Sequence, residues 1–401
     1  MSETSTPPDP PQGETKGRLD SVDALRGAVM ALMALDHARD FFHSGALHGV
    51  NPLDPATTTP ALFLTRWITH FCAPVFVLLA GAGAYLSMTR GRTKADLSRF
   101  LLKRGAWLIV LEMTFVQWAG WAWRIDLTVH FALVLWAIGW SMIGLAGLVQ
   151  LPLRWVAAIG AVLCAGHNAL DGVKAADLGA FGPLWVVLHE GGEVALGGGH
   201  RLLAGYPLVP WVGVMAIGYA LGSWLVLPPD ERRRRLMFAG TGMILMFLTL
   251  RASGVYGDPN PWRPDASALG TGYNFLSCAK YPPSLCYLLM TLGPALLLVA
   301  WSGISWPAWT APLVTFGRVP MFFYLLHLPL LHSLSLVLSI ILWGQAAWLF
   351  GFPSENAPPH VGIGLTGVYL AWLLSLTLLL SICGSFRNLK QRLQSPLLNY
   401  L

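Results

Sequence analysis

The residues best suited to chemistry are ionisable side chains inside an apolar stretch near the N-terminus. Residues 19–49 read LDSVDALRGAVMALMALDHARDFFHSGALHG, and this stretch contains Asp23, Arg26, Asp36, His37, Arg39 and Asp40. An imidazole can take up a proton near neutral pH, and a guanidinium binds phosphate or carboxylate groups well. These residue types predict acid–base chemistry or anion binding.

The spacing of these residues predicts that several share one helix face. Arg26 and His37 are eleven residues apart, which is about 16 Å along a helix and within about 20° of the same face. Asp23 lies near that face, and Asp36 or Asp40 could orient the His37 ring. The alternative is a structural ion network in which Asp23 simply pairs with Arg26. In either case the helix must face protein or water, because each such group costs about 2.5–3.5 kcal/mol in lipid.

Further polar candidates lie in other apolar segments and their connections. Arg66 and His70 are four residues apart and share a helix face. His327 is predicted to line a cavity, and His189 belongs to a glycine-rich stretch read as an acceptor-binding lid. Lys280 is either an acceptor contact or an interfacial lysine that reaches toward water. The alternative for this stretch is a metal site of His189, Glu190, Glu193 and His200, but HEGGE is not the HExxH motif and glycines are typical of a loop, so we assign no metal ligand.

The elements that must position these residues are apolar helices. Hydrophobic residues make up 55% of the chain and charged residues only 11%, well below the quarter typical of soluble proteins. About 20 apolar residues are needed for one crossing. Ten segments approach this length: 21–43, 61–88, 105–123, 129–150, 155–171, 206–227, 236–252, 283–301, 316–343 and 363–384. We therefore expect an all-α, polytopic integral membrane helix bundle of about ten transmembrane helices.

The distribution of cations predicts the orientation of this bundle. Lys and Arg gather at 90–104, at 232–235 and in the C-terminal tail, and cytoplasmic loops carry such an excess. Both termini are therefore predicted to be cytoplasmic. The net charge of +6 follows from this topology and does not indicate nucleic-acid binding. The predicted parts are a disordered tail (1–17), a transmembrane domain (18–386) and a C-terminal tail (387–401).

The cysteines give little sign of redox or metal chemistry. The five are Cys72, Cys164, Cys278, Cys286 and Cys383. No CxxC motif occurs, so neither a zinc nor a dithiol site is predicted. Cys278 and Cys286 could pair at the outer face, but their spacing does not require it.

Several motifs resemble those of a known family. The run SVDALRG followed ten residues later by His37 resembles the signature of the transmembrane acyltransferase superfamily. Segments 70–88, 206–222, 280–298 and 316–332 resemble its bacterial branch related to the heparan-α-glucosaminide N-acetyltransferase catalytic domain. The resemblance covers most of the chain from Leu19 to His332 and is strongest before Arg104.

This resemblance implies an enzyme of the bacterial inner membrane. Acyl-CoA, usually acetyl-CoA, would enter from the cytoplasm as a co-substrate, with no tightly bound cofactor. Its acyl group would pass to an amine or hydroxyl of a cell-envelope sugar or glycan. Arg26, Arg90 and Arg104 could contact the donor, although a basic loop also follows from topology alone.

The resemblance leaves two histidines open as the general base. His37 occupies the position expected from the O-acyltransferases, whereas His48 matches the loop histidine of the N-acetyltransferase branch. Asp36 and Asp40 would assist, and the acceptor would contact Asp23, Arg66, His70, His189, Lys280 and His327. A proton-coupled transporter or permease is the alternative function. Partners would be the lipid bilayer and the two substrates, without nucleic acid, and homo-oligomerisation stays open.

Overall fold

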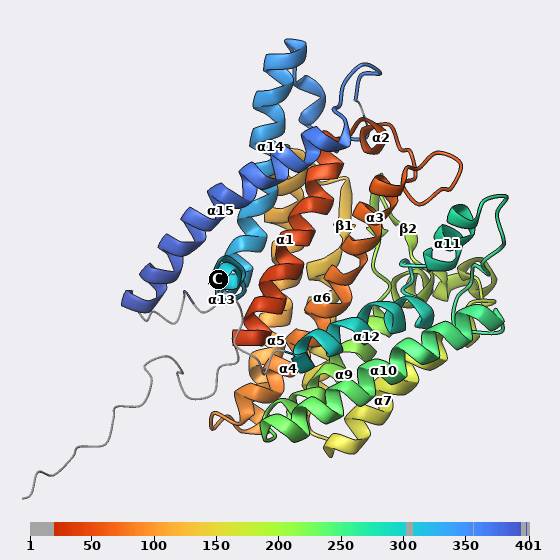
Figure 1. Cartoon of the computed structure of the whole chain (residues 1–401), viewed down its shortest axis with the longest axis vertical. Coiled ribbons are helices and arrows are strands. Elements are labelled where there is room, and N and C mark those ends of the chain that lie inside the picture. Colours follow the sequence, from red (N-terminus) through yellow and green to blue (C-terminus); the bar gives the residue numbers. More distant parts are fainter. Residues whose placement is uncertain (1–19, 302–307, 356, 394–397, 399–401) are drawn as a thin grey trace, which may run out of the picture.

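The protein is described by a computed structural model over residues 20–301, 308–355, 357–393 and 398. The predicted tail 1–17 lies outside these residues. The described chain is mostly helical (Figure 1). The α-helices are α1 Asp20–Phe42, α2 Ser44–Leu47, α3 Pro60–Ile68, α4 Cys72–Met88, α5 Lys94–Leu111, α6 Val134–Leu148, α7 Leu153–Gly166, α8 Gly182–Trp185, α9 Leu208–Leu225, α10 Pro229–Ser253, α11 Ala268–Leu276, α12 Leu285–Trp301, α13 Ala311–Arg318, α14 Pro320–Trp343 and α15 Leu365–Leu393.

Shorter helical turns connect or extend these helices. The most important are η1 Thr69–Phe71, which joins α3 to α4, and the π-helix η2 Glu112–Ala122, which continues α5. Others are η3 His167–Leu170, η4 Ala175–Phe181, η5 Val186–Glu190, η6 Ala308–Thr310 and η7 Ala347–Leu349.

The apolar helices confirm a helical bundle of membrane type. Each of the ten predicted segments contains a described helix. Among the described residues, six helical stretches are long and apolar enough to cross a bilayer: Pro60–Met88, Leu153–Leu170, Leu208–Leu225, Pro229–Ser253, Pro320–Trp343 and Leu365–Leu393. Helices α6 and α12 are apolar but shorter. Ten crossings and the placement of the termini stay predictions.

Helix α1 packs against α13, α14 and α15 and also against α4 (Figure 1). Most of its residues are buried, which its many charged groups require. Polar side chains of its neighbours bind its backbone: the Trp372 indole donates to the carbonyl of Ala31 over 2.8 Å, and the Ser335 hydroxyl donates to that of Phe41 over 3.0 Å.

Facing glycines allow the helices to approach closely. In each pair, an added Cβ on one glycine would meet backbone of the other helix: Gly27–Gly317 (α1 and α13), Gly81–Gly218 (α4 and α9), Gly105–Gly139 (α5 and α6), Gly160–Gly213 (α7 and α9) and Gly240–Gly293 (α10 and α12). Membrane helices associate through small residues of this kind, since lipid tails leave little hydrophobic drive for packing.

Two glycines of α4 provide a matched test of this packing. We expect Gly81→Ala to lower the thermal midpoint in detergent, because its methyl group would overlap the Met215 carbonyl; overpacking typically costs about 1–3 kcal/mol. Gly83→Ala should be neutral or slightly stabilising, because no atom lies within 4 Å of its Cβ position. Equal midpoints for the two variants would contradict close packing of α4 on α9.

A small sheet at the predicted outer end was not anticipated from the sequence. Strands β1 Val129–Ala132, β2 Gly192–Gly197 and β3 His200–Ala204 lie in the order β1-β3-β2. β1 and β3 are parallel, and β2 and β3 form an antiparallel hairpin. Glycines 197–199, all with positive φ, make the turn at little steric cost. Such short, glycine-rich strands leave too little alternation to predict.

The cysteines are all free thiols and all buried in the described structure. Cys278 and Cys286 therefore form no disulfide, the pairing that the sequence had left open. Burial among apolar side chains is the common state of free cysteines in protein cores.

Candidate functional site

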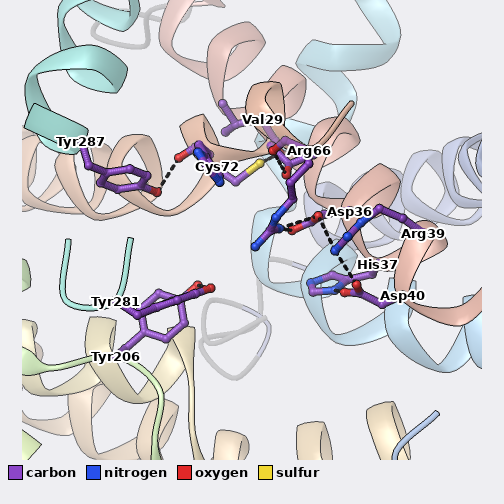
Figure 2. Close-up of polar contacts among 12 residues, drawn as sticks. Val29, Asp36, His37, Arg39, Asp40, Arg66, Cys72, Tyr206, Tyr281 and Tyr287 are labelled. Carbon is purple, nitrogen blue, oxygen red and sulfur yellow. Dashed lines mark hydrogen bonds and ion pairs between the residues drawn. The ribbon is translucent and has the colours of Figure 1, made fainter. Parts of the chain in front are cut away.

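A continuous ion network runs from α3 to the C-terminal half of α1 (Figure 2). Arg66 donates to Asp36 over 2.7 Å, and Asp36 lies 3.4 Å from the Arg39 guanidinium. Arg39 in turn donates to Asp40 over 2.7 Å, and Asp40 lies 3.3 Å from Nδ1 of His37. Opposite charges alternate along this chain, which offsets the cost of removing them from water.

His37 ends this network with one ring nitrogen available. Asp40 accepts from Nδ1–H in the tautomer that the network favours. Nε2 has no hydrogen bond to any residue that the structure describes. The ring packs against the edge of Trp121, with centroids 4.9 Å apart, and lies 5.3 Å from the ring of His327. An imidazole oriented at Nδ1 and open at Nε2 is the arrangement that a general base needs.

His37 lines a cavity of about 210 Å³, which we call the histidine cavity. The ion network forms one wall through its five members. Lys280, Tyr281 and Tyr206 also line this cavity, and the two tyrosine hydroxyls lie 3.4 Å apart. Figure 2 shows both tyrosine rings on the far side of the space that faces Asp36 and His37. The histidine cavity therefore combines an imidazole with several potential hydrogen-bond donors.

A second cavity, which we call the basic cavity, has a volume of about 360 Å³. Its polar lining includes the guanidiniums of Arg26, Arg92 and Arg104, and its remaining lining is mostly apolar. Arg92 is held over the Phe100 ring, 4.3 Å from the centroid, as in a cation–π pair. The basic cavity suits a molecule with an anionic head and an apolar or flexible arm.

The two cavities adjoin. Phe76, Val134 and Tyr324 line both of them, so these three side chains form the partition between the basic cavity and the histidine cavity. Glu112 supports the partition from η2, because its carboxylate accepts from the Leu135 amide over 2.7 Å at the start of α6. A carboxylate at a helix N-terminus satisfies an amide that the helix itself cannot.

The structure brings together only some of the residues singled out in the sequence. Asp36, His37, Asp40, Arg66 and Lys280 line the histidine cavity. Arg26 and Arg104 line the basic cavity, and Arg26 also donates to Asp23 over 3.0 Å and to the Gly317 carbonyl over 3.3 Å.

Other predicted residues lie elsewhere. His48 is exposed, and its two nitrogens lie 2.7 Å and 3.1 Å from the carbonyls of Ser44 and Pro358. Arg90 is exposed and does not line the basic cavity, whereas Arg92 does. His70 and His327 are almost fully buried behind the histidine cavity rather than in its lining, and His189 belongs to a separate cluster.

Aromatic residues of the site escaped sequence analysis. Trp121, Tyr206 and Tyr324 line the histidine cavity, but aromatic residues in apolar segments carry no polar signal. The sequence contains one signal for Tyr206. Like Tyr281, it directly precedes a proline at the start of a predicted transmembrane segment. Trp121, which packs on His37, belongs to the π-helix η2, a form often found at functional sites.

Comparison with known proteins supports a family assignment. The family model described as "Heparan-alpha-glucosaminide N-acetyltransferase, catalytic" matches residues 18–253. This range is more than half of the chain and includes the ion network, His37 and the three arginines of the basic cavity. No curated protein matches the sequence.

Proposed function

The chain belongs to the family of the heparan-alpha-glucosaminide N-acetyltransferase catalytic domain, and from this premise we propose a membrane acyltransferase with two adjoining substrate cavities. The basic cavity takes acyl-CoA, and the histidine cavity takes an amine or hydroxyl of a sugar. The observation that carries this proposal is the shared partition of Phe76, Val134 and Tyr324. The membrane would be a bacterial inner membrane, and the acceptor a cell-envelope glycan.

The basic cavity fits the parts of acyl-CoA. The phosphates would lie against Arg26, Arg92 and Arg104, since guanidiniums bind phosphate with two parallel hydrogen bonds. The flexible pantetheine arm would follow the mostly apolar lining toward the partition. The thioester would then lie between Tyr324 and His37, within reach of an acceptor in the histidine cavity.

The histidine cavity supplies the groups that acyl transfer requires. His37 Nε2 would take the proton from the acceptor amine or hydroxyl while that atom attacks the thioester carbonyl. Asp40 would stabilise the resulting imidazolium through Nδ1–H. Lys280 or Tyr281 could donate to the developing oxyanion. The carbon–sulfur bond then breaks, the CoA thiolate leaves, and the imidazolium returns the proton to it.

Donor binding should depend on the cations that line the basic cavity. We expect Arg104→Gln to weaken acetyl-CoA binding about ten- to 100-fold, because a hydrogen bond to a charged group contributes about 1.5–3 kcal/mol. The neighbouring exposed Lys103 does not line the cavity, so Lys103→Gln serves as the control and should bind almost normally. Calorimetry on protein in detergent would measure both.

Two outcomes would contradict the proposal. If wild-type protein neither binds nor hydrolyses acetyl-CoA, the basic cavity is not a donor site. Proton-coupled uptake of a solute into proteoliposomes without CoA would instead support a transporter, whose intramembrane charges would carry protons.

A further inference from the structure

Three side chains typical of metal sites meet at the outer end of α7. His167 begins η3, Asp171 follows one helical turn later, and His189 comes from η5. One ligand atom from each residue lies within 4.8 Å of the other two, and Nε2 of His189 is 3.3 Å from a carboxylate oxygen of Asp171. The outer loop from 172 to 188 thus returns to the helix from which it started.

Both histidines are buried, and their ring nitrogens lack well-aligned hydrogen bonds. Their exposed fractions are 1% for His167 and 3% for His189. None of their four ring nitrogens has a well-aligned hydrogen bond to any described residue, although Asp171 is near. A buried polar group without a partner costs about 1–3 kcal/mol, so two such rings, with centroids 5.8 Å apart and a carboxylate beside them, call for a ligand.

We propose that His167, Asp171 and His189 bind a divalent transition metal, with Zn²⁺ the ion that their donors suit best. Two imidazoles and one carboxylate form a common zinc donor set, with water in the fourth position. Zinc–ligand distances of about 2.0–2.1 Å put tetrahedral donors roughly 3.4 Å apart. The donor atoms therefore have to approach one another by a little more than about 1 Å to bind zinc. Small side-chain rotations allow this.

Neighbouring groups already orient the donors. The Asn168 amide donates to the second oxygen of Asp171 over 2.9 Å, and its carbonyl accepts from the Leu285 amide over 2.9 Å. The Pro283 carbonyl lies beside the His167 ring. Metal ligands are usually held by such outer partners.

A metal at this site would stabilise the position of the glycine-rich stretch around His189 beside the histidine cavity. Glu190, Gly191 and Gly192 directly follow His189 and line a further outer cavity together with Tyr206 and Tyr281. The two tyrosines also line the histidine cavity. The metal would thus fix the loop that shapes the acceptor side, a structural role independent of the acyl-transfer chemistry.

Metal content tests this inference directly. Full-length protein, purified in detergent with a tag free of histidine and dialysed against Zn²⁺-buffered solution, should retain about one Zn²⁺ per chain by mass spectrometry. Zn²⁺ should also raise its thermal midpoint. His189→Ala and Asp171→Asn should lose the retained zinc and the zinc-dependent shift. His200→Ala should keep both, because His200 lies in the same outer segment but its Nδ1 contacts only the Leu127 carbonyl.

Co²⁺ provides a second readout that does not depend on stability. A cobalt-loaded wild type should show the intense visible absorption of tetrahedral Co²⁺, and His167→Ala should not. Wild-type protein without retained zinc, or His189→Ala with zinc content equal to wild type, would overturn the inference. Either result would leave the proposed acyl transfer untouched, since neither measures turnover.

Discussion

Replacement of His37 by alanine is expected to lower kcat for acyl transfer about 100- to 10,000-fold, the usual contribution of a general base. The protein should still fold, because the His37 side chain is 19% exposed and makes a single hydrogen bond. Acetyl-CoA binding should change little, since His37 does not line the basic cavity. Turnover of acetyl-CoA with a glycan amine, together with CoA release, would measure the loss.

The matched control is His48→Ala, which removes the other histidine that the sequence offered as the base. His48 is exposed, and its ring nitrogens lie against the backbone carbonyls of Ser44 and Pro358. We therefore expect activity close to that of wild type. If His37→Ala kept full activity and His48→Ala lost it, His48 would be the general base, which would contradict our assignment.

Asp40 offers an intermediate test of how His37 is oriented. Asp40→Asn keeps the shape of the side chain but removes the charge that stabilises the imidazolium. We expect kcat to fall less than in His37→Ala, with almost unchanged Kd for acetyl-CoA. If Asp40→Asn weakened acetyl-CoA binding by the same factor as it lowered kcat, Asp40 would support the fold rather than orient His37.

The sequence predicted the central helix of the site well because helical periodicity is strict. The eleven-residue spacing placed Arg26 and His37 on one face, and each lines one of the two adjoining cavities. Asp40 is the carboxylate that contacts His37, whereas Asp36 pairs with Arg66. The periodicity could not decide between the two carboxylates, since both lie within one turn of His37.

Contacts between distant segments could not be predicted from a single sequence. His167 and His189 are separated by the loop that brings them together, and only the packing of that loop on α7 makes them a cluster. Arg251 shows the same limit, because no feature of the neighbouring sequence predicts which groups it contacts. In the structure its guanidinium is buried, donates to four backbone carbonyls and lies 3.4 Å from Asp258.

The largest effect on stability should come from breaking the buried pair of Asp36 and Arg66. Asp36→Asn or Arg66→Met alone should cost about 3–5 kcal/mol, because each leaves a charge without its main partner in the bundle. The double variant Asp36→Leu/Arg66→Met should regain most of this loss, since apolar replacement of a buried ion pair is often neutral. Unfolding of the detergent-solubilised protein, followed by circular dichroism, would measure the three variants.

A control and an activity assay separate stability from function in this network. The exposed pair of Arg235 and Glu231, with a 2.6 Å contact, should contribute less than about 1 kcal/mol, so Arg235→Gln should be almost as stable as wild type. The stable double variant should nevertheless stay poorly active, because Asp36 and Arg66 line the histidine cavity and Asp36 helps to hold Arg39. Recovery of activity along with stability would mean that the network only supports the fold. Single variants as stable as wild type would instead mean that water, rather than protein, surrounds these charges.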